Sequence, residues 1–191
     1  MPATSEVLIA PRIASIQQEA KLLAWAKELE SGNYRQASGF LCSYAGDPEE
    51  LENAWFDQVW EGEIEEGPFP PPSDEELAYC CLGVMCEISP QVKEKLWYGD
   101  SSPGYSYTFP KLGGEGERYR ADMPPAELLA EYGLVKGGII AYSEMGAGAL
   151  SMFLRTGNAS YLATANDCGA SFETIAKTIR EYVRNGGPTN E

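Results

Sequence analysis

Apolar residues recur at helical spacing along much of the chain, and this periodicity predicts five or six helices. In the first helix, Leu22, Trp25 and Leu29 share one face, and Ser31-Gly32 ends the element because glycine commonly follows the last helical residue. The final helix opens at Ser171 and ends before two consecutive glycines. The predicted helical segments are 13–31, 47–60, 73–88, 90–97, 124–132 and 171–185.

The most distinct helix start is Ser73, followed three residues later by Glu76, a pair typical of a capping box. Behind it, four apolar side chains share one helical face, which indicates a buried helix at the centre of the fold. These residues are Leu77, Cys81, Val84 and Ile88.

A smaller part of the chain has the alternating pattern of β-strands. Tyr105, Tyr107 and Phe109 alternate with smaller residues, and segment 118–120 is the expected hairpin partner. Segment 137–143 predicts another short strand, whereas 146–158 is interrupted by glycine too often to assign. The pattern therefore predicts one α+β domain over residues 1–191, mainly helical, with a small antiparallel β-hairpin. The segments expected as connections or a flexible tail are 33–42, 61–72 and 186–191.

Composition limits the possible functions. The chain has 191 residues, 43% of them apolar, and a net charge of −15. This charge argues against direct binding of nucleic acid, which requires clustered Lys and Arg. The absence of histidine removes the commonest general base and metal ligand. No signal peptide or spanning segment is recognisable, so we expect a cytoplasmic protein with its five cysteines reduced and no membrane association.

The negative charge is concentrated in one segment. Between Gln36 and Val92 the chain has thirteen acidic residues and no Lys or Arg. A solvated acidic face explains this pattern, and so does docking on a basic, nucleic-acid-binding surface of another protein. An exposed tryptophan face would also favour a homodimer. The candidate partner-binding residues are Trp55, Phe56, Trp60, Glu63, Glu65 and Glu66.

Few residues suggest catalysis or metal binding. A metal site is not indicated by the spacing of Cys80, Cys81 and Cys86. We expect these three cysteines to pack as small apolar residues in a core helix. Segment 166–172 fits an ordinary turn with a serine cap, although the backbone N–H groups of a helix start can also hold an anion. We therefore predict no catalytic residues, no metal and no cofactor.

Two motifs resemble a family of small, functionally uncharacterised proteins of bacteriophages and prophages. They are the YCCLGV sequence beginning at Tyr79 and the Asn-Asp-x-Gly-x-Ser-Phe-x-x-Ile-Ala sequence beginning at Asn166. Segments 31–36 and 123–134 are also similar to that family. The chain departs from it by an acidic insert over residues 44–72, where the family has a short turn. The resemblance implies a phage accessory protein in the host cytoplasm and supplies no catalytic residues.

The similar segments contain polar residues that a core does not require. If the first, central and last helices pack together, these residues form a pocket with aromatic walls and polar groups. The candidate ligand-binding residues are Tyr34, Arg35, Gln36, Tyr79, Asn166 and Asp167. The leading hypothesis is a counter-defence protein that sequesters a small nucleotide-like ligand. The alternatives are an acidic nucleic-acid mimic that inhibits a basic host protein and, less favoured, a hydrolase using Asp167.

Overall fold

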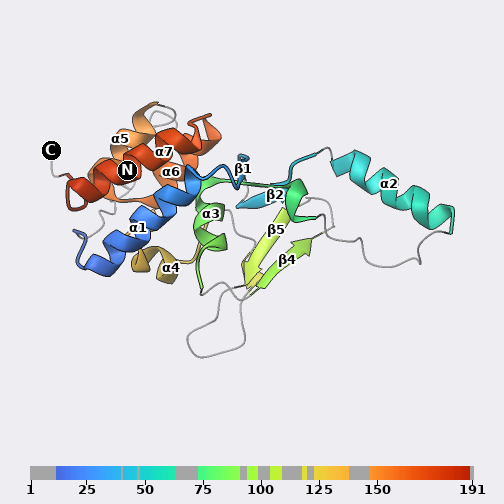
Figure 1. Cartoon of the computed structure of the whole chain (residues 1–191), viewed down its shortest axis with the longest axis horizontal. Coiled ribbons are helices and arrows are strands. Elements are labelled where there is room, and N and C mark those ends of the chain that lie inside the picture. The colour runs from blue at the N-terminus through green and yellow to red at the C-terminus, as the bar shows by residue number, and fades with distance from the viewer. Residues whose placement is uncertain are drawn as a thin grey trace, which may run out of the picture.

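The computed structural model describes residues 12–39, 41–46, 48–62, 73–90, 94–98, 104–108, 118–119, 123–137 and 147–189 (Figure 1). Within these ranges the fold is α+β and mainly helical, as predicted. Its helices are α1 (Ile16–Leu29), α2 (Pro48–Trp60), α3 (Cys81–Glu87), α4 (Ala126–Glu131), α5 (Ala147–Thr156), α6 (Ala159–Asp167) and α7 (Phe172–Arg184). Its strands are β1 (Arg35–Gln36), β2 (Cys42–Tyr44), β3 (Leu77–Tyr79), β4 (Glu94–Tyr98), β5 (Gly104–Thr108) and β6 (Arg118–Tyr119).

Helices α1, α5, α6 and α7 form what we call the helical body, and α3 packs against it on the side that faces the sheet. Figure 1 shows α1, α5, α6 and α7 gathered together, with α3 between this group and the strands. Every residue from Cys81 to Cys86 is buried, which confirms the expected central helix. Trp25 of α1 is fully buried, and its indole Nε1–H donates to the carbonyl oxygen of Cys81 at 2.9 Å. This bond satisfies the polar end of a large apolar side chain and fixes α1 against α3.

The strands form one mixed sheet in the order β1-β3-β2-β5-β4, with β6 paired to β5. The short strand β1 runs parallel to β3, so that Arg35 lies opposite Ala78 and Gln36 opposite Tyr79. The other pairs are antiparallel. The predicted hairpin is confirmed, because Tyr107 of β5 pairs with Tyr119 of β6. The sheet is nevertheless larger than the hairpin that the sequence predicted.

The prediction of one helix over 73–88 is wrong in its first half. The capping contact does form, since the backbone N–H and hydroxyl of Ser73 donate to Glu76 Oε2 at 2.9 and 2.7 Å. It encloses only a 3₁₀ turn, Asp74–Glu76, and the next three residues form the buried strand β3. Pairing with β1 and β2 on its two sides outweighs the local helix signal. Helix α3 starts anew at Cys80, whose sulfur accepts the Gly83 N–H at 3.4 Å.

Two further segments differ from expectation, and a third had no predicted element. The connection predicted over 33–42 contains β1 and the first residue of β2, and the short helix predicted over 90–97 is replaced by β4, which pairs with β5 along its whole length. Segment 146–158 includes α5, and Gly157, with a φ of 64°, turns the chain into α6. Gly148 and Gly157 therefore lie near helix ends. The predicted strand 137–143 falls outside the described residues except for Gly137.

The two described ends of the chain lie together. Ile13 N–H donates to the carbonyl oxygen of Gly186 at 3.2 Å, and Thr189 N–H donates to that of Leu154 at 3.0 Å. Residues 186–189, part of the segment predicted as a flexible tail, are thus hydrogen-bonded to the helical body. None of the described helices has the length and apolarity needed to cross a lipid bilayer.

Tyr182 provides a test of the core. Its side chain is fully buried, its ring centroid lies 4.8 Å from that of Phe153, and its hydroxyl has no hydrogen-bond partner among the described residues. A buried unsatisfied hydroxyl is destabilising, so we expect Tyr182→Phe to raise the free energy of unfolding by about 1 kcal/mol. Urea denaturation monitored by circular dichroism measures this change. A loss of stability would show instead that the hydroxyl has a polar partner, such as a buried water.

Candidate functional site

The six predicted ligand-binding residues come together in the fold but divide into two groups. Tyr34 and Arg35 precede and begin β1, and Tyr79 ends the adjacent strand β3. Asn166 and Asp167 end α6 and are linked by hydrogen bonds to the segment that follows Arg35. The first group lines a pocket, and the second group joins two parts of the fold.

Gln36 and Asn166 form a contact that we call the amide clamp. Gln36 Nε2–H donates to Asn166 Oδ1 at 3.0 Å and to the carbonyl oxygen of Ala170 at 2.7 Å. Gln36 Oε1 accepts the backbone N–H of Phe172 at 3.0 Å. Asn166 Nδ2–H donates to the carbonyl oxygen of Ala37 at 2.6 Å. The clamp therefore fixes the chain after β1 to the junction between α6 and α7.

Asp167 extends the same contact. Its Oδ1 accepts the backbone N–H of Gly39 at 2.8 Å. At the start of α7, Ser171 Oγ accepts the Thr174 N–H at 3.2 Å, while the N–H of Phe172 is already bound by Gln36. A ligand would have to displace these bonds to use the same atoms. The candidate ligand-binding site therefore does not include Gln36, Asn166 and Asp167.

The candidate site is a pocket of about 670 Å³ beside β1, β3 and α3. It contains three of the predicted residues together with charged and small residues that the sequence did not indicate. Glu75 and Glu87 stood out only as members of the acidic run, and nothing in their spacing related them to Tyr34. The lining residues are Gly32, Asn33, Tyr34, Arg35, Glu75, Leu77, Tyr79 and Glu87.

Local structure explains how these side chains meet. After α1, Gly32 takes a φ of 76°, a left-handed conformation that suits glycine, and the chain turns into β1. The parallel pairing of β1 with β3 then brings Tyr34 and Tyr79 into contact. Their rings meet edge to face, with centroids 5.3 Å apart and planes at 89°.

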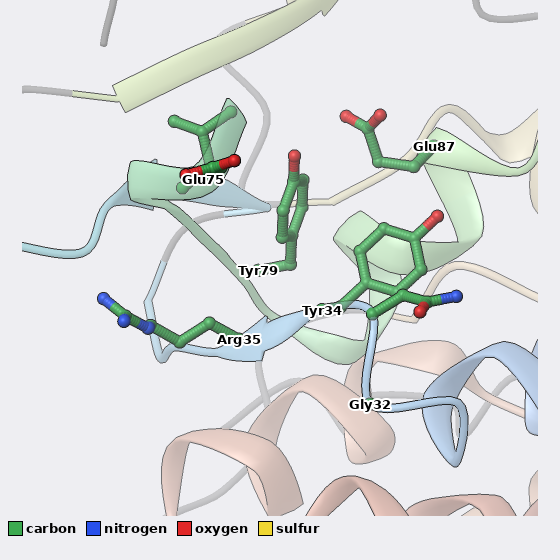
Figure 2. A pocket seen from close by; sticks show the side chains of 8 residues that line it. Gly32, Tyr34, Arg35, Glu75, Tyr79 and Glu87 are labelled. Carbon is green, nitrogen blue, oxygen red and sulfur yellow. The ribbon is translucent and has the colours of Figure 1, made fainter. Parts of the chain in front are cut away.

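The charged groups lie toward different ends of the pocket. In Figure 2, Arg35 points toward one end, Glu87 stands toward the other, and the two tyrosine rings lie between them. Arg35 and Glu75 are exposed, and neither has an ion-pair partner among the described residues. One guanidinium and two carboxylates leave the lining with a small net negative charge. Figure 2 shows the Glu75 carboxylate on the same side of the tyrosine rings as Arg35 and the Glu87 carboxylate on the other side. The pocket therefore has a guanidinium and a carboxylate toward one end and a hydrogen-bond acceptor, Glu87, toward the other.

The ionisation of Tyr34 follows from this environment. Burial raises the pKa of Tyr34 above its usual value of 10.0, and the nearby carboxylates of Glu87 and Glu28 raise it further. Its hydroxyl thus stays protonated at neutral pH. A protonated phenol can donate a hydrogen bond to an acceptor on a bound molecule.

The cysteines do not add a reactive group to the site. All five are reduced thiols, of which four are buried and only Cys168 is exposed. Burial raises the pKa of the Cys81 and Cys86 thiols well above the usual value, which keeps them protonated and unreactive. This agrees with their prediction as core residues. Across the described ranges, no group of three or more Cys, Asp or Glu side chains is placed to hold a metal ion.

The predicted partner-binding residues lie on α2 and beyond it. Phe56 is 53% exposed and Trp60 is 92% exposed, and Trp55 is on the same helix. Glu63, Glu65 and Glu66 lie outside the described residues. The structure thus places two aromatic side chains of this set at the surface.

No protein-family model, curated protein or solved structure matches the chain. The resemblance to phage proteins accordingly stays a prediction. The function proposed below is therefore argued from the residues that line the pocket.

Proposed function

We propose that this chain is a phage accessory protein that binds a small nucleotide-like ligand in the Tyr34–Tyr79 pocket and sequesters it in the host cytoplasm. The observation that carries the proposal is an aromatic pair between a guanidinium and a carboxylate in one pocket. Removal of a signalling nucleotide would give such a protein its counter-defence role.

Each part of a nucleotide has a counterpart in the pocket. A base can stack on the partly exposed ring of Tyr34, in a contact worth about 1–3 kcal/mol per base. Tyr79, which is 6% exposed, meets Tyr34 edge to face and holds that ring in place. Arg35 is suited to a phosphate because its guanidinium donates two parallel hydrogen bonds. The carboxylate of Glu87 can accept hydrogen bonds from an exocyclic amine of the base.

Charge limits the number of phosphates. Glu75 and Glu87 repel a phosphate chain, and among the described residues of the lining only Arg35 is basic. A ligand with a single phosphate therefore suits the pocket better than a triphosphate.

The first test is native mass spectrometry of the protein purified from a bacterial host, before and after denaturation. We expect release of a small molecule with the mass of a nucleotide. Calorimetric titration with AMP, GMP, CMP and UMP, and with the corresponding nucleosides, then measures binding directly. The proposal is wrong if no small molecule is released and none of these probes binds.

Variants of the pocket give a sharper prediction. We expect Tyr34→Ala and Arg35→Gln each to weaken binding of a nucleoside monophosphate at least about tenfold, because stacking and phosphate pairing are lost. Arg35→Gln should leave nucleoside binding unchanged, and Glu75→Gln should tighten monophosphate binding. The matched control is Arg155→Gln, an exposed arginine outside the pocket. Equal effects of Arg35→Gln and Arg155→Gln would exclude the pocket as the site.

A further inference from the structure

Glu75 lies at the same end of the pocket as Arg35, and the proposed function gives it only a repulsive effect on phosphate. Figure 2 shows its carboxylate on the same side of the tyrosine rings as the Arg35 guanidinium. The pairing of β1 with β3 explains this placement, because Arg35 lies opposite Ala78, three residues after Glu75. The two charged groups therefore belong to one part of the pocket.

Other residues fix the backbone that presents Glu75. Glu76 Oε2 accepts both donors of Ser73, and the Glu76 N–H donates to the carbonyl oxygen of Ser73 at 3.0 Å. The carbonyl oxygen of Glu76 accepts the N–H of Ala45 at 2.8 Å, and Leu77 is buried in β3. Glu75 takes no part in these bonds, and its exposed carboxylate has no partner among the described residues. Its oxygens are thus available to accept hydrogen bonds from a ligand.

Arg35 and Glu75, both in the described part of the chain, do not form an ion pair with each other. Each group can therefore contact a different part of one ligand, an anion at Arg35 and a hydrogen-bond donor at Glu75. In a nucleoside 5′-monophosphate, the group next to the phosphate is the ribose, whose 2′- and 3′-hydroxyls can both donate. Two adjacent hydroxyls suit a single carboxylate, because it has two acceptor oxygens.

We propose that Glu75 accepts hydrogen bonds from the 2′- and 3′-hydroxyls of the ligand's ribose and so restricts the pocket to ribonucleotides. This inference rests on the proposed function, because it needs the base at Tyr34 and the phosphate at Arg35. Hydrogen bonds to a carboxylate are stronger than those between neutral groups, and an acidic side chain contacts the ribose in the same way in dinucleotide-binding folds. A deoxyribonucleotide would meet the same repulsion from Glu75 with less compensation from its sugar.

The test is calorimetric titration of the full-length protein with AMP, GMP, CMP and UMP and with their 2′-deoxy and 2′,3′-dideoxy counterparts. We expect ribonucleotides to bind at least about fivefold more tightly than their 2′-deoxy forms, because a hydrogen bond to a charged group is lost. The dideoxy forms should bind more weakly still. In Glu75→Ala the ratio of ribonucleotide to deoxyribonucleotide affinity should fall to about one. Glu75→Gln keeps an acceptor oxygen and should retain part of that ratio.

Nucleosides separate hydrogen bonding from charge repulsion. A nucleoside has no phosphate for Glu75 to repel, so Glu75→Ala should weaken binding of a ribonucleoside at least about fivefold and leave that of its 2′-deoxy form unchanged. A purely repulsive Glu75 would change neither. The matched control is Glu127→Ala, which replaces an exposed glutamate at the start of α4, outside the pocket lining. This control should leave every affinity ratio unchanged.

The outcomes distinguish this inference from the function on which it rests. Equal binding of ribonucleotides and deoxyribonucleotides by the wild type would overturn the inference and leave the proposed function intact. A preference for ribose that persists in Glu75→Ala would also overturn it, because another group would then contact the hydroxyls. Failure of every nucleotide and nucleoside to bind would overturn both. Because Glu75 is exposed, its replacement should leave the fold intact, which circular dichroism verifies.

Discussion

Replacing Gly83 with alanine is expected to destabilise the protein by about 3 kcal/mol or more, or to prevent folding. A Cβ atom at this position would lie 1.6 Å from the carbonyl oxygen of Leu41 and 2.6 Å from its carbonyl carbon. These are backbone atoms, which cannot move aside as the end of a flexible side chain can. The same carbonyl oxygen accepts the Cys80 N–H at 3.2 Å, so the added methyl group would also separate α3 from the segment leading into β2.

Gly148→Ala is the control for this prediction. Gly148 lies in α5, and a Cβ atom there would meet no other atom within 4 Å. Alanine has the higher helix propensity, so stability should stay unchanged or rise by up to about 1 kcal/mol. Thermal and urea denaturation of both variants separate the two effects. A Gly83→Ala protein as stable as the wild type would contradict the close packing of α3 on Leu41.

The elements predicted correctly are those determined by local sequence. Helix α1 has a long amphipathic stripe, and α7 combines such a stripe with a serine cap at Ser171 and glycines after its end. Gly133, with a φ of 69°, ends α4 as expected. Caps, stripes and terminal glycines act within a few residues, so the sequence shows them directly.

The short strands could not be predicted in the same way. Strands β1 and β3 have two and three residues, too few to display an alternating pattern. They exist because each pairs with a segment distant in sequence, as Arg35 does with Ala78. Glu75 and Glu87 enter the pocket only through this pairing and through the placement of α3, which explains why sequence analysis missed them as site residues.

The sequence identifies Gln36 and Asn166 as polar residues of the segments that resemble phage proteins, but it does not show whether they bind a ligand or stabilise the fold. Gln36 and Asn166 are 130 positions apart, and their residue types suit a ligand site as well as an internal hydrogen-bond network. Only the three-dimensional contacts show that their amide groups bind each other and the backbone.

Asn166→Ala is therefore expected to reduce the free energy of unfolding by about 2–3 kcal/mol, because partners of its side chain are left unsatisfied. Asn166 is only 3% exposed, and its amide joins Gln36 and the carbonyl oxygen of Ala37. The exposed Asn185, at the end of α7, provides the control substitution Asn185→Ala, for which we expect little change. Urea denaturation of the two variants measures the difference.

A double-mutant cycle tests the clamp itself. If Gln36 and Asn166 act as one unit, Gln36→Ala adds less to the destabilisation in the presence of Asn166→Ala than it causes alone. A ligand-binding role would produce a different result: Asn166→Ala would weaken binding of a nucleoside monophosphate while leaving stability unchanged. The two measurements on one variant thus decide whether the motif residue Asn166 holds the fold together or contacts a ligand. The structure favours the first outcome, because Gln36 and the Ala37 carbonyl already occupy its amide.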